Sequence, residues 1–159
     1  MQKRATFLTS GWDGTVRQWT LTPEGAIQRG IEVTRECEPA FPAKGGTFLG
    51  LAMSTDGRRA GAIVNRGPNG MGSRRNLLVW DFKADARKPA LEFATSPGDI
   101  DFCAVTFIPD DTGVATADRE GTIRVWDLPG LKERPVRSPQ PHALLAKGMV
   151  WGLALSPDG

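Results

Sequence analysis

The stretch that decides the fold is residues 121–128, GTIRVWDL, which closes a short β-branched run with Trp126. Two other segments end in the same way, GTVRQWTL at 14–21 and NLLVWDF at 76–82. Because β-branched and aromatic residues favour strands, each segment predicts a strand that ends at a tryptophan. Three copies of one pattern indicate an internal repeat.

A second pattern joins an apolar run to an acidic turn. Its copies are FLGLAMSTDG at 48–57, AVTFIPDD at 104–111 and VWGLALSPDG at 150–159. Between the acidic turn and the following tryptophan of a repeat we expect a further strand, at 59–64 in one copy and 113–117 in another. A weaker fourth strand is expected after each tryptophan, at 26–33, 89–94 and 134–137. Four short strands per unit predict one antiparallel sheet, and strands without clean polar alternation indicate sheets covered on both faces.

These residues resemble the WD-repeat (WD40) β-propeller family. The resemblance rests on Trp80-Asp81, Trp126-Asp127, the degenerate Trp19-Thr20, the Ser156-Pro157-Asp158-Gly159 turn and the Gly-Thr-Val/Ile-Arg run before the tryptophan. It implies an all-β fold, a partial β-propeller of about three four-stranded antiparallel blades. Such repeats contain ~40–45 residues, so 159 residues hold about three units, fewer than the ~4 blades of a closed propeller.

The repeats divide the chain into one propeller segment, 1–159. Its parts are an incomplete blade at 1–34, a second blade at 47–97 with an inserted loop at 65–76, a third blade at 102–138, and the first strand of a further blade at 148–159. The incomplete blade lacks its strand one. The strand near residue 150 would complete it, either in a second copy of the chain or within a longer propeller.

The resemblance also implies a set of structural repeat residues. They are Asp13, Trp19, Trp80, Asp81, Glu120, Trp126, Asp127 and Asp158. In the family a turn aspartate, a serine or threonine, the tryptophan and a histidine form a hydrogen-bonded tetrad. Here Gly11 and Asp118 are expected at the serine position, Arg74 stands at the aspartate position of the second copy, and His142 lies too early to take part.

Composition excludes several classes of protein. With 19 glycines and 12 prolines in 159 residues, long helices and coiled coils are excluded. No apolar stretch suits a membrane span or a signal peptide, so we expect a soluble, cytoplasmic chain with no membrane partner. Cys37 and Cys103 stand far apart without a CxxC motif, which predicts two buried thiols and no metal site. A net charge of +2 makes nucleic acid an unlikely partner.

Five residues are candidates for binding a protein partner: Trp12, Arg66, Arg74, Arg75 and Arg119. By the resemblance they lie on the face that carries the blade connections, and tryptophan and arginine are enriched at binding hot spots. Packing of Trp12 against a neighbouring loop, and a solvated arginine loop, are the competing interpretations. The Gly70-Met71-Gly72 sequence lacks the lysine and the following helix of a phosphate loop, so we reject nucleotide binding.

Little in the sequence predicts catalysis, and no cofactor or catalytic residue is assigned. The carboxylates fall in turns, where acidic residues have structural roles. The leading hypothesis is a non-enzymatic scaffold that binds a protein through its loop-rich face. The alternatives are a propeller segment of a larger enzyme or regulator, for example fused to a kinase or protease domain, and phosphate or nucleic-acid binding through Arg66, Arg74 and Arg75.

Overall fold

The computed structural model describes residues 5–11, 15–33, 47–65, 75–84, 89–95, 100–135, 150 and 152–156. The strands, in chain order, are β1 (Ala5–Ser10), β2 (Val16–Leu21), β3 (Ile27–Val33), β4 (Thr47–Met53), β5 (Arg59–Asn65), β6 (Arg75–Asp81), β7 (Leu91–Phe93), β8 (Phe102–Phe107), β9 (Gly113–Asp118), β10 (Ile123–Asp127) and β11 (Lys132–Arg134). No helix in the part of the chain so described has the length and apolarity to cross a bilayer.

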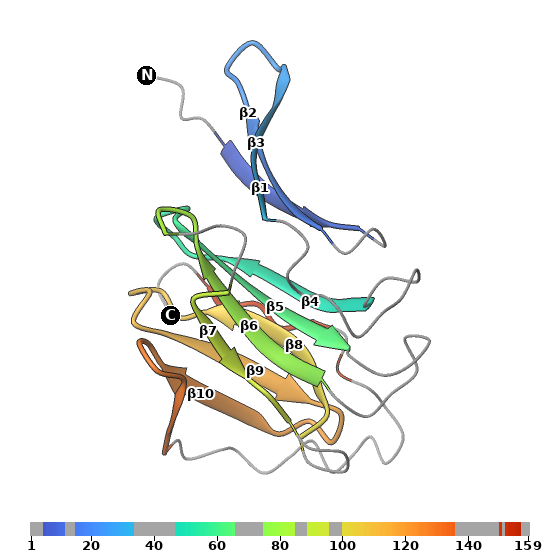
Figure 1. The fold of residues 1–159 in the computed structure, drawn as a ribbon, viewed down its shortest axis with the longest axis vertical. Coiled ribbons are helices and arrows are strands. Elements are labelled where there is room, and N and C mark those ends of the chain that lie inside the picture. The colour runs from blue at the N-terminus through green and yellow to red at the C-terminus, as the bar shows by residue number, and fades with distance from the viewer. Residues whose placement is uncertain are drawn as a thin grey trace.

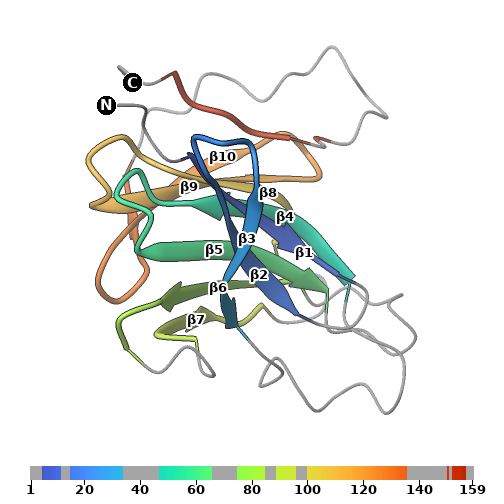
Figure 2. The same cartoon turned by 90° about the horizontal axis from the view of Figure 1, so that it is seen from above.

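The strands form three antiparallel sheets in chain order: β1-β2-β3, β4-β5-β6-β7 and β8-β9-β10-β11. Figures 1 and 2 show the sheets packed in succession, with β1 next to β4 and β4 next to β8. The expected all-β fold, a partial β-propeller of three antiparallel sheets, is confirmed. We call the sheets blades 1, 2 and 3.

Several strand boundaries differ from the sequence prediction, and β7, expected at 89–94, spans Leu91–Phe93. The fourth strand of blade 3 is β11, which begins at Lys132 and not at Arg134. Gly130 and Leu131 have positive φ angles of 106° and 49°, so the chain turns sharply there and returns to the sheet at once. Arg75, expected in the inserted loop, is the first residue of β6 and pairs with Asn65.

Blades 2 and 3 share an apolar core. Its buried residues are Ile63, Leu77 and Val79 from blade 2 and Phe102, Val105, Phe107, Val114, Trp126 and Leu131 from blade 3. Phe93 lies against Trp126, with ring centroids 4.5 Å apart. Strands β4 and β8 approach closely at Gly50, where a Cβ would lie 3.2 Å from Ala104 Cα, so a larger residue would force a small shift of the backbone.

Blades 1 and 2 share a second core. Val16 of blade 1 packs with the buried residues Ala60, Ala62, Val64, Leu78, Trp80 and Phe82 of blade 2. Alternate residues of β5 and β6 therefore face opposite neighbours, and both faces of blade 2 are covered. This explains why these strands read as continuous apolar runs.

The three tryptophans at the strand ends have different surroundings. Trp80 packs toward blade 1 and Trp126 toward blade 2, so each faces the preceding sheet. Trp19 lies on the opposite face of blade 1, where no described residue forms a covering sheet. There Phe7 and Leu21 are 38% and 39% exposed. The face of blade 1 that carries Trp19 is therefore open in the described structure.

The tryptophan hydrogen bonds correct the expected tetrad positions. Trp126 Nε1 donates to Thr116 Oγ1 at 2.8 Å, and Trp19 Nε1 donates to Thr9 Oγ1 at 2.8 Å. The prediction of Gly11 and Asp118 at the serine position was wrong. The strand register gives the reason. Trp126 pairs with Val114, so the diagonal neighbour on the same face is Thr116, whereas Asp118 lies a further two residues along the strand.

The buried indole bond yields a stability prediction. Thr116→Val removes the acceptor of Trp126 Nε1 without a large change in volume, and an unsatisfied buried donor costs about 1–3 kcal/mol. Denaturant unfolding measures the loss. Thr9→Val is the matched control, because Trp19 is more exposed and water replaces its acceptor. An equal loss of unfolding free energy in both variants would contradict this account.

Candidate functional site

The strand directions place two sets of turns on opposite edges of the blades. One edge carries the β5–β6 and β9–β10 turns and the β7–β8 connection, and we call it the connector edge. The other carries the β4–β5, β6–β7, β8–β9 and β10–β11 turns, and we call it the opposite edge. Arg75 and Arg119, two of the predicted binding residues, both lie at the connector edge.

Asp101 brings the two arginines together. Its Oδ1 lies 2.6 Å from Arg75 Nε, and its Oδ2 lies 3.6 Å from Arg119 Nη1. Arg75 Nε and Asp101 Oδ1 are buried and have no well-directed hydrogen bond among the described residues, so their contact is an ion pair. By sequence, Asp101 falls in a predicted turn, and no spacing of residues links it to Arg75.

Arg75 is held by the protein itself. Its Nη1 donates to the Phe102 carbonyl oxygen at 3.0 Å and to Cys103 Sγ at 3.0 Å, and its side chain is only 12% exposed. Burial raises the pKa of the Cys103 thiol, although the Arg75 charge opposes this shift. Cys103 is a buried free thiol, as expected, while Cys37 lies outside the described residues.

Arg119 is the exposed member of the pair. Its side chain is 54% exposed. Its backbone N–H donates to the Asp101 carbonyl oxygen at 3.0 Å, which fixes the turn beneath it. The structure therefore presents a guanidinium on an anchored backbone.

A cleft of about 550 Å³ lies beside this turn, between blades 2 and 3. Its lining residues are Phe93, Ala94, Thr95, Ile100, Asp118, Glu120, Thr122 and Arg124. Asp118 Oδ1 accepts hydrogen bonds from the N–H groups of Glu120 and Thr122, at 3.1 and 2.8 Å, and Asp118 Oδ2 pairs with Arg124. Asp118 thus organises the turn, while the Glu120 side chain is exposed.

Only some of the other predicted binding and repeat residues lie in the part of the chain that the structure describes. Trp12, Asp13, Arg66, Arg74 and Asp158 lie outside the described residues, so their roles stay predictions. Asp81 and Asp127 accept hydrogen bonds at the opposite edge, from the Lys83 N–H and the Arg134 guanidinium respectively.

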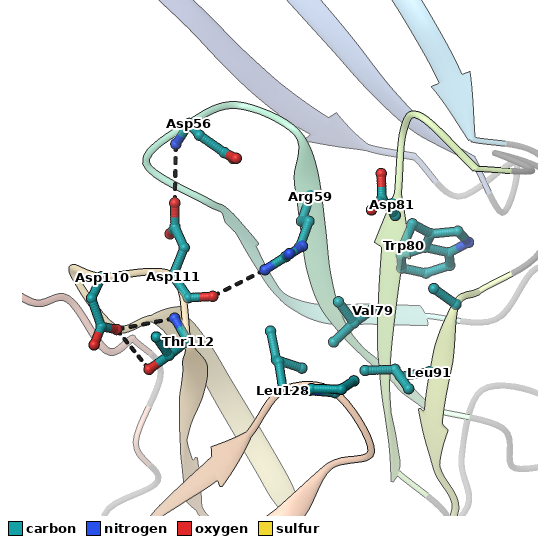
Figure 3. Close-up of a pocket in the computed structure, with 12 residues that line it drawn as sticks. Asp56, Arg59, Val79, Trp80, Asp81, Leu91, Asp110, Asp111, Thr112 and Leu128 are labelled. Carbon is teal, nitrogen blue, oxygen red and sulfur yellow. Dashed lines mark hydrogen bonds between the residues drawn. The ribbon is translucent and has the colours of Figure 1, made fainter.

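A second cleft, of about 710 Å³, lies between blades 2 and 3 at the opposite edge (Figure 3). It is lined by Asp56, Arg59, Val79, Trp80, Asp81, Ala90, Leu91, Asp110, Asp111, Thr112, Leu128 and Pro129. No local pattern in the sequence indicates this cleft, because its walls come from turns and strand ends of two different repeats.

Asp111 bridges the two walls of this cleft. Its Oδ1 accepts from Thr55 N at 2.9 Å, and its Oδ2 accepts from Thr55 Oγ1 at 2.6 Å and Asp56 N at 3.1 Å. Arg59 Nη1 donates to the Asp111 carbonyl oxygen at 3.0 Å (Figure 3). The β8–β9 turn of blade 3 is thereby joined to the β4–β5 turn of blade 2.

Two carboxylates at this cleft have lowered pKa values. Hydrogen bonds from the Ser54 hydroxyl and the Arg58 N–H lower the pKa of Asp56. Hydrogen bonds from the Thr112 N–H and hydroxyl lower the pKa of Asp110. Both groups are therefore ionised at neutral pH. Across the described residues, no group of three or more His, Cys, Asp or Glu side chains is arranged to hold a metal ion.

The Asp56 shift can be tested by substitution. A lowered folded-state pKa contributes stability above the unfolded-state pKa, and that contribution is lost as pH falls through the folded-state value. Ser54→Ala removes the main cause, so the pKa of Asp56 should rise toward its ordinary value in an NMR carboxyl titration. Thr112→Val is the matched control and should raise the pKa of Asp110 alone. An unchanged Asp56 midpoint in Ser54→Ala would refute the assignment.

Comparison with known proteins locates one repeat in this structure. The family model described as WD domain, G-beta repeat, matches residues 91–127. That span begins with β7 of blade 2 and continues through β8, β9 and β10 of blade 3. No curated protein matches the chain. Residues 91–127 thus match a WD40 repeat, in agreement with the predicted WD-repeat resemblance, and they lie within the three antiparallel sheets of a partial β-propeller.

Proposed function

We propose that this protein is a non-enzymatic interaction module that binds a protein partner through its connector edge. WD40 repeats typically belong to non-enzymatic scaffolds and mediate protein–protein interactions, which supports the class. The observation that carries the choice of surface is the exposed, anchored guanidinium of Arg119 beside a cleft.

The geometry of Arg119 suits recognition of a carboxylate. An arginine presents parallel N–H donors that match the two oxygens of a carboxylate. The hydrogen bond from its N–H to Asp101 fixes the backbone, so less conformational entropy is lost on binding. Asp101 also contacts the guanidinium at 3.6 Å and so limits its range of orientations.

The neighbouring cleft suits an apolar side chain. Phe93 and Ile100 contribute apolar surface, and Thr95 and Thr122 contribute polar groups. Of the charged lining residues, Asp118 and Arg124 pair with each other, and Glu120 is exposed. A partner segment with an Asp or Glu next to an apolar residue matches both features. Trp12, Arg66 and Arg74 would extend this surface if their predicted positions on the same edge hold. The expected cytoplasmic location also stays a prediction.

Two alternative functions, phosphate or nucleic-acid binding and a role in a larger enzyme or regulator, also involve the connector edge. The Asp101 contact neutralises part of the Arg75 charge, so phosphate or nucleic-acid binding by the arginine loop would depend mainly on Arg66 and Arg74. A larger enzyme or regulator that contains this propeller segment is compatible with a connector-edge site, because the binding surface would serve that protein equally.

Peptide selection tests the connector-edge proposal. A random peptide library is selected on the immobilised protein, and the affinities of recovered peptides are measured. We expect an acidic residue beside an apolar one, and Arg119→Ala should weaken binding at least about 5-fold, as at an interface hot spot. Arg119→Lys should restore only part of the affinity, because it keeps the charge without the bidentate geometry.

Arg58→Ala is the matched control for that experiment. Arg58 is a similarly exposed arginine, but it lies at the opposite edge. Its substitution should leave the affinity of the acidic peptides unchanged. Equal weakening by Arg58→Ala and Arg119→Ala, or a selection without acidic residues, would reject the connector-edge site.

A second interaction involves the outer side of β1. Blades 2 and 3 have β4 and β8 as first strands, whereas blade 1 has no such strand among the described residues. Residues 150–156 (VWGLALS) resemble residues 48–54 (FLGLAMS), with Gly152, Leu153 and Ala154 at the positions of Gly50, Leu51 and Ala52. A strand of this sequence, from a second copy or a longer chain, is proposed to pair with β1.

Light scattering tests closure by a second copy. Exchange of the 150–156 strand between two chains predicts a species of twice the single-chain mass of 17.2 kDa. Disruption of the exchanged strand by Leu153→Pro should then return the mass to that of one chain, because proline cannot donate its ladder hydrogen bond. A single-chain mass for the unaltered protein would contradict closure by a second copy.

A further inference from the structure

We propose that the opposite-edge cleft between blades 2 and 3 is a second binding site, which accepts a peptide segment with a lysine or arginine beside an apolar residue. This site lies across the blades from Arg119 and has the opposite charge. It goes beyond the connector-edge function and does not depend on it.

The cleft combines an apolar wall with an acidic rim. Val79 and Leu91 of blade 2 and Leu128 and Pro129 of blade 3 supply the apolar surface. Figure 3 shows Val79, Leu91 and Leu128 in the cleft. Leu91 and Leu128 pack partly against the core, so their positions are set by the fold. An apolar side chain that enters the cleft therefore meets a surface that is already formed.

The charge of the lining selects the partner. Four aspartates and one arginine line the cleft, so the lining is net negative. The arginine, Arg59, already donates to the Asp111 carbonyl oxygen. Asp56 is 43% exposed at the rim, where Arg58 Nε lies 3.9 Å from Asp56 Oδ2. The lowered pKa values of Asp56 and Asp110 keep both carboxylates charged at neutral pH. A cation is therefore the complementary group, and an anionic ligand would be repelled.

The size and rigidity of the cleft favour a short peptide segment. About 710 Å³ lies within the range of ordinary ligand sites and holds a few side chains. The three hydrogen bonds from blade 2 to Asp111 fix the two walls relative to each other. A preformed cleft loses little conformational entropy when it is filled.

NMR with synthetic peptides tests this proposal. The ¹⁵N-labelled protein is titrated to millimolar concentration with acetyl-Leu-Lys-Leu-Lys-amide, and with two analogues in which glutamate replaces lysine or serine replaces leucine. We expect saturable amide shifts at Asp56, Leu91, Asp110 and Leu128 with the first peptide only, and weaker binding at higher salt. Shifts centred elsewhere, no saturable shifts, or equal binding of either analogue would overturn the proposal.

Matched charge variants complete the test. Asp56→Asn with Asp110→Asn removes two rim charges in nearly isosteric form and should weaken the leucine–lysine peptide about 3- to 10-fold. Glu24→Gln with Glu133→Gln removes the same charge from exposed positions outside both clefts and should have no effect. Equal weakening by both pairs would show a nonspecific charge effect and reject the site.

Arg119→Ala separates the two proposals. It should leave leucine–lysine binding unchanged, because Arg119 lies at the connector edge. If the leucine–lysine peptide binds but the peptide selection recovers no acidic peptide, the proposed function is rejected and the opposite-edge cleft is supported. Loss of the basic peptide in Arg119→Ala would show that the two surfaces are not independent and would overturn the inference.

Discussion

The packing of blade 2 between two neighbouring sheets is the constraint on which the rest of the structure depends. A sheet with apolar residues on both faces is stable in water only when both faces are covered. Leu77 and Val79 face blade 3, whereas Leu78 and Trp80 face blade 1. This arrangement fixes the distance between blades, and thereby the walls of both clefts.

Ion pairs and hydrogen bonds also fix how the packed blades are oriented relative to each other. Asp101 joins Arg75 and Arg119 at the connector edge, and Asp111 joins the turns of blades 2 and 3 at the opposite edge. Each carboxylate links segments that are far apart in the sequence. The connector edge consequently presents an exposed cation, and the opposite edge presents an acidic cleft. The exposed cation of Arg119 and the acidic lining of the opposite-edge cleft are the features on which the two proposed interactions depend.

Much of the fold was predictable because its signals are local. The GTIRVWDL pattern places β10, and the apolar run before STDG places β4, since strand propensity and turn residues act over a few neighbours. The tetrad positions were less predictable. Spacing to Trp126 suggested Asp118 at the serine position of the tetrad, but the diagonal of the strand register places Thr116 there as the acceptor of the indole N–H. The β11 boundary was misplaced because positive φ angles at Gly130 and Leu131 shorten the turn.

The sequence by itself determined the repeat, the three sheets and the all-β class, because strand patterns repeat along one chain. Only the tertiary structure decided the candidate sites. Arg75 and Arg119 meet at Asp101, and Asp56 and Asp111 meet at the opposite edge, because blade packing brings turns of different repeats together. Such pairings depend on the relative placement of whole sheets, which no local pattern of residues encodes.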